Sequence, residues 1–376
     1  MIDVFAFITE ARDRGGSDLH LVVDSPPLAR VRGSLEPIGD AMLMPADTAA
    51  ALDQLAQPAD REVFHRELEL DFGFTMPGVG RLRCNAAQQR GAISLAIRLL
   101  PPVIPTIDEL ELPRICKELV VRPRGLVIVT GPTGSGKSTT LAAMIQHLNN
   151  NEAKHVVTIE DPIEYIYPSI KCAITQRQLG TDTRSFGQAL KHVLRQNPDV
   201  ILVGEMRDLD TAAAVLTIAE TGHLVLSTSH APSTHQALER IIDLFPPHER
   251  HLAYTRLASL LMGVLCQTLV PRAAFQGRIA AVEIMLANAA VRNLIREEKL
   301  YQLPNVIRTS RDEGMITMDE SLVDLYRRDK ITRDTVLAFC NDADEVDRLM
   351  GGRPRTPVRR RPSSSGGGGT SFASFL

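Results

Sequence analysis

Two different patterns of apolar and polar residues follow one another along the chain. Residues 3–14 place apolar side chains at helical spacing before Gly15, and the alternation from Leu19 to Val23 predicts a strand after this helix. Strand-like segments punctuated by Gly and Pro continue to residue 100, and a second helix is expected at about residues 46–57. This pattern predicts a small α+β domain over residues 1–100.

A proline-rich segment separates this part from the remainder of the chain. Residues 101–113 contain four prolines and are interpreted as an interdomain linker. Over residues 114–350 short apolar strands alternate with helical stretches, which predicts an α/β domain with a parallel, doubly wound sheet. The predicted strands are 125–130, 155–161, 199–205 and 223–230, and the predicted helices run to Asn150, from about 185 to 196 and onward from Leu209.

The chain after the last of these strands is expected to be mostly helical up to about Met350. Its most apolar window, Leu257 to Val270, is shorter than the ~20 residues that a membrane helix needs. This window is therefore interpreted as a buried core helix.

A glycine-rich loop joins the apolar strand Leu126 to Thr130 to an amphipathic helix, and it matches GxxxxGK[ST]. In such a loop the backbone N–H groups and the helix N-terminus bind phosphate, Lys137 reaches the outer phosphate oxygens, and Ser138 binds Mg²⁺. The match predicts a site for ATP and Mg²⁺. Its residues are Gly131, Pro132, Thr133, Gly134, Ser135, Gly136, Lys137, Ser138 and Thr139.

Acidic residues follow two later strands. Glu160, Asp161 and Glu164 crowd the end of a strand expected beside the P-loop strand, and Glu205 follows the buried run Val200 to Val203. The carboxyl ends of such strands form the ligand-binding edge of a parallel sheet. We therefore expect both clusters in one site.

The sequence does not assign the catalytic and the metal-binding role to particular carboxylates. An Asp often precedes the second Glu in P-loop enzymes and helps to hold the magnesium, but Gly204 takes that place here. Glu160 and Glu164 are candidates to replace it. One of Glu160 and Glu205 is expected to orient the attacking water while the other positions the metal. His230, at the end of a third apolar strand, is a candidate sensor of the γ-phosphate, and His223, before that strand, is a weaker one.

Charge and cysteine content narrow the function classes. The formal net charge is −3, and without the five arginines after residue 350 it is −8, which argues against a nucleic-acid partner. The five cysteines show no CxxC spacing and predict buried reduced thiols. The N-terminus has no signal-peptide pattern, so a cytoplasmic protein is expected. Residues 351–376 are expected to form a disordered basic tail.

Several motifs together resemble one protein family. They are SDLHL near the start, GPTGSGKSTT, TIEDPIEY, VILVGEMRD, TGHLVLSTSH and RIIDLFP. With these the chain resembles the secretion and pilus motor ATPases, and within them the type IV pilus retraction ATPases of the PilT and PilU type. AVRNLIRE favours PilT, whereas RQNPDV and NDADEVDRLM favour PilU.

The resemblance implies a homohexameric ring of two-domain subunits, with a PAS-like N-terminal domain, a RecA-like ATPase domain, and ATP between them. It also implies that arginines of the N-terminal domain reach the phosphates, and the matching positions are Arg83 and Arg98, with Arg81 as a weaker candidate. The ring is expected at the cytoplasmic face of the inner membrane, peripheral and not inserted, where it drives a pilus platform protein. A paralogous retraction ATPase is a further candidate partner.

Three alternatives remain beside this interpretation. The first is a pilus extension or type II secretion ATPase, although such proteins usually carry an additional N-terminal domain and a tetracysteine zinc insertion. The second is a RecA-like nucleic-acid motor, which has the same P-loop sheet. The third is a nearly inactive ring member that binds an active partner.

Overall fold

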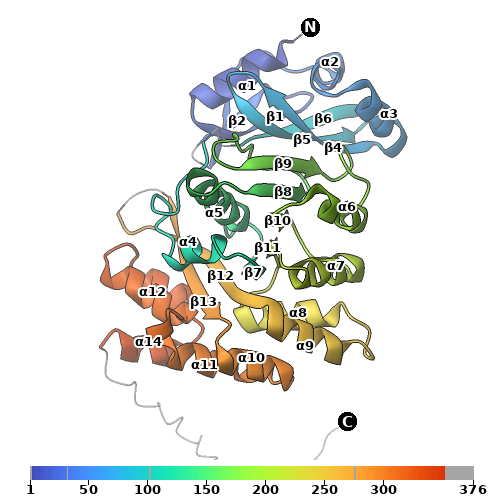
Figure 1. Cartoon of the computed structure of the whole chain (residues 1–376). Coiled ribbons are helices and arrows are strands. Elements are labelled where there is room, and N and C mark those ends of the chain that lie inside the picture. Colours follow the sequence, from blue (N-terminus) through green and yellow to red (C-terminus); the bar gives the residue numbers. More distant parts are fainter. Residues whose placement is uncertain (1, 32, 101–102, 275–276, 352–376) are drawn as a thin grey trace, which may run out of the picture.

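The computed structural model describes residues 2–31, 33–100, 103–274 and 277–351, which form two sheets with their covering helices (Figure 1). The first sheet has six antiparallel strands in the order β3-β2-β1-β6-β5-β4. Helices α1, α2 and α3 pack on one side of it. The bounds are α1 Val4–Asp13, β1 Gly16–Leu21, β2 Leu28–Val31, β3 Ser34–Pro37, α2 Pro45–Leu55, α3 Pro58–Glu67, β4 Glu69–Met76, β5 Gly80–Gln89 and β6 Ala92–Leu99.

Alternation along the strands gives this sheet two different faces. Leu82 and Cys84 of β5 and Ile97 of β6 are buried against the helices, whereas Arg83 and Arg98 point to the opposite face. The predicted helix at about 46–57 corresponds to α2, and α3 was not predicted because its sequence is strongly polar. In Figure 1 the side of the sheet that carries no helices is turned toward the second sheet, and Arg83 and Arg98 line a cavity together with residues of that sheet.

The second sheet has seven strands in the order β13-β12-β7-β11-β10-β8-β9. All neighbouring pairs are parallel except β12 and β13, so the sheet is mixed rather than entirely parallel. The bounds of the elements up to β11 are α4 Ile115–Val120, β7 Gly125–Thr130, α5 Lys137–Asn151, β8 His155–Glu160, β9 Ala173–Gln178, α6 Phe186–Val193, β10 Val200–Val203, α7 Leu209–Glu220 and β11 Leu224–Thr228.

Helices cover both faces of this sheet. Alternate residues of β7 enter different cores: Leu126 and Ile128 pack with α6 to α11, whereas Val127 and Val129 pack with α4 and α5. The remaining bounds are α8 Thr234–Asp243, α9 Arg250–Leu260, β12 Leu261–Pro271, β13 Arg278–Leu286, α10 Ala289–Arg296, α11 Leu303–Thr309, α12 Met318–Arg327, α13 Arg333–Phe339 and α14 Ala343–Leu349, with short 3-10 turns at Leu194–Gln196, Leu300–Gln302 and Arg311–Glu313.

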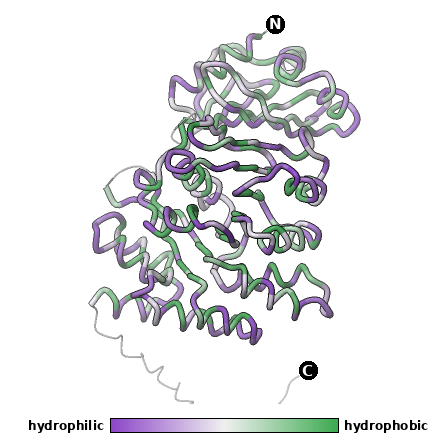
Figure 2. Tube along the Cα trace, in the orientation of Figure 1, coloured by the Kyte–Doolittle hydropathy of each residue, from purple (hydrophilic) through white to green (hydrophobic). Residues whose placement is uncertain are grey.

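The predicted core helix over Leu257 to Val270 is wrong. Helix α9 ends at Leu260, and the apolar run continues as β12, which pairs with β7 and with β13. A strand buried on both faces is a continuous apolar run that lacks two-residue alternation, so its sequence resembles that of a buried helix. Figure 2 shows this hydrophobic stretch inside the second sheet. The chain after residue 231 is accordingly less helical than predicted.

The segment predicted as a linker is anchored to the second sheet where it is described. Ile107 and Leu112 are buried with α4 and α5, and Glu111 forms ion pairs with Arg272, Arg328 and Lys330 at 2.8, 3.1 and 2.8 Å. Almost all of the predicted tail, from residue 352, lies outside the described residues. Within the described part of the chain, no helix is long and apolar enough to cross a membrane.

Candidate functional site

The glycine-rich loop lies between β7 and α5, as predicted, and its backbone needs glycine. Gly131, Gly134 and Gly136 have φ angles of 140°, 77° and 88°. A Cβ on Gly131 would lie 2.3 Å from the carbonyl oxygen of Gln267. Gly136 precedes α5 and provides no side-chain cap, so the first N–H groups of the helix remain available to an anion.

Two buried side chains at this loop, Lys137 and Gln267, are held by hydrogen bonds. Lys137 Nζ donates to the carbonyl oxygens of Gly131 and Pro132 at 2.9 and 3.0 Å. Burial lowers the pKa of Lys137, an effect that the Glu205 and Glu164 carboxylates oppose. Gln267 of β12 donates to Ser135 O at 2.6 Å and accepts from Thr140 at 2.9 Å. Sequence reasoning missed Gln267 because its strand was interpreted as a helix.

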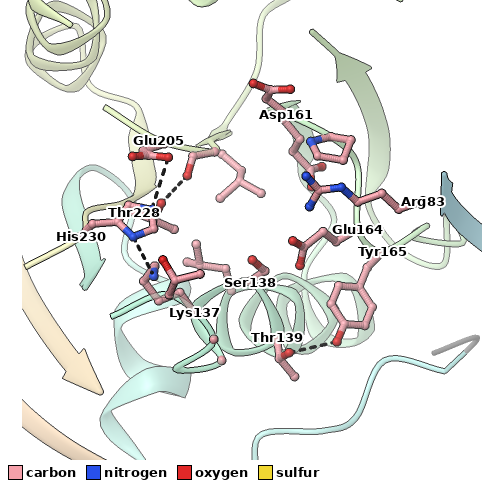
Figure 3. A pocket seen from close by; sticks show the side chains of 18 of the residues that line it. Arg83, Lys137, Ser138, Thr139, Asp161, Glu164, Tyr165, Glu205, Thr228 and His230 are labelled. Atoms are coloured by element: carbon pink, nitrogen blue, oxygen red, sulfur yellow. Dashed lines mark hydrogen bonds and ion pairs between the residues drawn. The ribbon is translucent and has the colours of Figure 1, made fainter. Parts of the chain in front are cut away.

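Glu205 and His230 lie at the carboxyl ends of the neighbouring strands β10 and β11 (Figure 3). His230 Nε2 is 3.4 Å from Glu205 Oε2, and its Nδ1 is 3.4 Å from Lys137 Nζ. Glu205 also pairs with Arg207 at 2.7 Å. His230 therefore connects the P-loop lysine with the acidic residue that follows β10.

The backbone that follows His230 is held from two directions. Thr130 donates to Ala231 O at 3.0 Å and accepts from Ala231 N at 2.9 Å. Buried Glu283 of β13 accepts from both Thr234 N and Thr234 Oγ1, at 2.8 and 2.7 Å. His223, in contrast, lies at the other end of β11 beside Thr221, so it is not part of the site.

Glu160 is the last residue of β8, which adjoins β10, so the two acidic strand ends are neighbours. The prediction that β8 adjoins the P-loop strand is wrong, because β11 and β10 lie between β8 and β7. Gly204 packs against the end of β8, where a Cβ would be 3.3 Å from Ile159 O. This close approach of the two strand ends explains why a glycine precedes Glu205.

Glu160 is the most buried of the predicted acidic residues, with 9% of its surface exposed. It accepts hydrogen bonds from Thr158 at 2.6 Å and from Gln176 at 3.2 Å. Burial raises the pKa of Glu160 to about 7 despite these bonds. Glu164 lies across the pocket from Glu205, near Ser138 and Arg83 (Figure 3).

Residues from both sheets line a cavity of about 580 Å³ at this site. Most of the predicted residues line it, whereas Gly131, Pro132 and Ser135 of the loop do not. Arg207 and Arg278 line it as well and were not predicted. The predicted residues in the lining are Arg83, Arg98, Thr133, Gly134, Gly136, Lys137, Ser138, Thr139, Glu160, Glu164, Glu205 and His230.

The arginines of the six-stranded sheet differ in their contacts. Arg83 reaches into the pocket (Figure 3), and Arg98 donates to Asp18 at 2.9 Å. Arg81 donates to Gln178 of β9 at 2.8 Å and so connects the two sheets. Gly73 makes room for it, since a Cβ there would lie 2.1 Å from the Arg81 guanidinium.

A second cavity of about 520 Å³ adjoins the first and shares Gly136, Thr139, Leu269 and Arg278 with it. Its lining is mainly apolar, and Leu110 and Leu112 contribute to it. Across the described residues, no group of three or more His, Cys, Asp or Glu side chains is placed to hold a metal ion.

Comparison with known proteins agrees with this geometry. Residues 107–327 match the family described as type II/IV secretion system protein. The chain is 42% identical to the type IV pilus retraction ATPase PilT of Pseudomonas aeruginosa over 89% of this chain and 96% of that protein. It is 40% identical to the type IV pilus ATPase PilU of the same organism over 90% of this chain and 88% of that protein.

A solved structure is also similar over nearly the whole chain. It is a crystal structure of the pilus retraction motor PilT with bound ADP, which has a TM-score of 0.86 and 40% identity and covers 93% of this chain and 100% of that one. The predicted resemblance is thus confirmed. The chain belongs to the type II/IV secretion system protein family, among its PilT- and PilU-type ATPases.

Proposed function

We propose that this chain is a Mg²⁺-dependent P-loop ATPase that hydrolyses ATP to ADP and phosphate and thereby powers type IV pilus retraction. The single observation that carries the proposal is the 42% identity to a pilus retraction ATPase over 96% of that protein's length. The acidic and basic residues around the P-loop provide the chemistry that such a motor needs.

The P-loop fits a nucleotide phosphate chain. The uncapped start of α5 and the left-handed glycines present backbone N–H groups to an anion, and Lys137 exchanges its two carbonyl partners for phosphate oxygens. Ser138 and one of Glu160 and Glu205 would hold Mg²⁺, which neutralises charge on the phosphates when it is bound. The buried Ser135 hydroxyl has no partner among the described residues, so it can donate a hydrogen bond to a phosphate oxygen when the loop adjusts.

Glu205 is the proposed group that orients the attacking water. It is less buried than Glu160, and it lies beside His230, which also approaches the P-loop lysine. This contact would let His230 report the state of the outer phosphate to Glu205. Glu160 is then the carboxylate that would help Ser138 to hold Mg²⁺, and its hydrogen bonds to Thr158 and Gln176 fix one of its oxygens.

Arg83 and Arg98 would stabilise charge on the transferring phosphoryl group. They face one another across β5 and β6, an arrangement of like charges that is unfavourable unless an anion lies between them. Both side chains come from the six-stranded sheet, whereas the P-loop belongs to the seven-stranded sheet. Hydrolysis would therefore loosen one sheet from the other and produce a movement of rigid bodies.

The second cavity is the proposed site of the nucleobase. It begins at Gly136 and Thr139, where the phosphate site ends, and its apolar lining includes Leu110, Leu112 and Leu269. Apolar walls with a few polar groups are typical of base-binding pockets. Replacing Leu110, which lines the second cavity but not the first, with Asp should weaken ATP binding while it leaves binding of inorganic tripolyphosphate unchanged.

We further propose a homohexamer that acts peripherally at the cytoplasmic face of the inner membrane and drives a pilus platform protein. A gene deletion tests this function. Surplus, unretracted surface pili are expected, and the wild-type chain should restore retraction while its Glu205→Gln variant should not. Cells without pili would instead assign the chain to pilus extension.

Two measurements on the purified protein separate the remaining alternatives. Single-stranded DNA should leave the ATPase rate unchanged, whereas strong stimulation would favour a nucleic-acid motor. The ATPase rate of a mixture with a paralogous retraction ATPase should equal the sum of the rates that the two proteins show separately. A large gain in the mixture would indicate a ring member that depends on an active partner.

A further inference from the structure

A row of four charged side chains crosses the polar face of the six-stranded sheet. In the register of the strands, Arg83 of β5 lies opposite Arg98 of β6, Arg98 lies opposite Asp18 of β1, and Asp18 lies opposite Arg30 of β2. Directly opposed residues of antiparallel strands point to the same face, with Cβ atoms ~5 Å apart. The row therefore holds three cations and one anion on the side of the sheet that carries the cavity.

Asp18 is the anion of this row, and its partner is Arg98. The Asp18 carboxylate accepts from Arg98 Nε at 2.9 Å and lies 4.0 Å from Arg30 Nε. Its side chain is 14% exposed, whereas that of Arg98 is 61% exposed. Burial raises the pKa of Asp18, but hydrogen bonds from Ser17 and Arg98 together with the charge of Arg98 outweigh this effect. The pKa of Asp18 is therefore lowered overall, and the carboxylate is charged at neutral pH. Asp18 is a fixed charge, and Arg98 is the mobile member of the pair.

The position of Arg98 gives this pair a consequence for the cavity. Arg98 lines the cavity together with the P-loop residues, but Asp18 does not. A guanidinium that donates to Asp18 has fewer N–H groups for a phosphate and feels a weaker attraction to it. An anion in the cavity and the carboxylate on β1 therefore compete for the same side chain.

We propose that Asp18 is a positioning residue that holds Arg98 back from the nucleotide phosphates and so limits the affinity for ATP. The inference rests on the proposed nucleotide-binding function and assigns a role to the acidic residue of the SDLHL motif. When ATP occupies the cavity, Arg98 exchanges Asp18 for the phosphates. When the nucleotide leaves, Asp18 takes the arginine back, which keeps the two like charges of Arg83 and Arg98 apart.

The test is the affinity for ATPγS in the presence of Mg²⁺, measured by calorimetry on the full chain at one fixed ionic strength. Asp18→Asn keeps the size of the side chain and removes its charge, so it should bind ATPγS about threefold to tenfold more tightly. Asp18→Glu should retain the wild-type affinity. Asp53→Asn is the matched control, because Asp53 pairs with Arg61 away from the cavity, and it should change nothing.

The same measurement in an Arg98→Gln background separates this inference from the proposed function. Arg98→Gln alone should weaken binding, and Asp18→Asn should then have no further effect. Unchanged or weaker binding by Asp18→Asn, with Arg98→Gln still weaker than wild type, would overturn the role of Asp18 alone. If Arg98→Gln binds ATPγS as tightly as wild type, the arginine has no part in nucleotide binding. The proposed contact of Arg98 with the phosphates and the proposed role of Asp18 then both fail.

Discussion

The two walls of the cavity are built differently. On the wall formed by the seven-stranded sheet, Lys137 and Glu160 are buried, and each already has protein partners. On the wall formed by the six-stranded sheet, Arg98 has a largely exposed side chain, and Arg83 makes no ion pair or side-chain hydrogen bond with any described residue. From these contacts we expect the first wall to be rigid before a ligand arrives and the side chains of the second wall to adjust to it. Changes in the first wall should therefore affect both catalysis and stability, whereas changes in the second wall should affect nucleotide binding and catalysis without a loss of stability.

The largest effect is expected from Glu205→Gln on the rigid wall. Loss of the carboxylate that orients water should lower kcat by about 10²–10³-fold, a loss typical of removing one preorganised group from an active site. The affinity for ATPγS should stay within a few-fold of wild type, because Lys137 and the P-loop backbone remain. Glu220→Gln is the control, because Glu220 ends α7, pairs with Arg256 of α9 and does not line the cavity. Sustained turnover by Glu205→Gln protein would show that this assignment is wrong.

Glu160→Gln tests whether a buried charge on the same wall reduces stability. The folded pKa of Glu160, about 7, lies above its ordinary value of 4.5, so the folded protein holds this proton more tightly than the unfolded chain does. Stability conferred by the protonated carboxyl is fully present below the ordinary pKa and is lost as the pH rises through the folded pKa. At ~1.4 kcal/mol per pKa unit, the loss approaches about 3 kcal/mol.

Urea unfolding of Glu160→Gln and wild type, without nucleotide and with EDTA, measures this difference. The variant should gain stability relative to wild type between about pH 5 and about pH 8. Glu67→Gln alters an exposed carboxylate, and its free energy of unfolding should equal that of wild type at both pH values. Parallel pH dependence of Glu160→Gln and wild type would mean that burial does not raise the pKa of this carboxyl.

The sequence predicted the rigid wall better than the contacts that support it. The P-loop is one continuous segment between a strand and a helix, so its residues are recognisable without the tertiary fold. Glu160 and Glu205 were placed correctly at the ends of strands, but the order of those strands depends on long crossover connections that local pattern does not encode. Gln267 was missed because a strand buried on both faces was interpreted as a helix. The pairing of Asp18 with Arg98 depends on the register between β1 and β6, which the hydrophobic pattern left open.

Thr130→Val examines how firmly the rigid wall holds its histidine. Valine has nearly the shape of threonine, but it loses both hydrogen bonds to Ala231 and leaves a buried N–H and a buried C=O without those partners. A cost of about 1–3 kcal/mol in unfolding free energy is expected. The ATPase rate should also fall, because the segment that carries His230 is no longer fixed. Thr217→Val, on the exposed side of α7, should change neither quantity.

The smallest effect is expected on the wall formed by the six-stranded sheet, where a change in activity should occur without a change in stability. Arg83→Gln should raise the KM for ATP, lower kcat and so lower kcat/KM by about tenfold or more, since one charge near the phosphates and the transferring phosphoryl group is worth ~1.4 kcal/mol or somewhat more. The midpoint of thermal unfolding should not change, because Arg83 forms no ion pair with any residue that the structure describes. Arg66→Gln, which removes an exposed arginine of α3, is the control for overall charge. If Arg83→Gln destabilises the protein as much as Thr130→Val does, Arg83 is part of a preformed structure, and the two walls do not differ in the way that their contacts indicate.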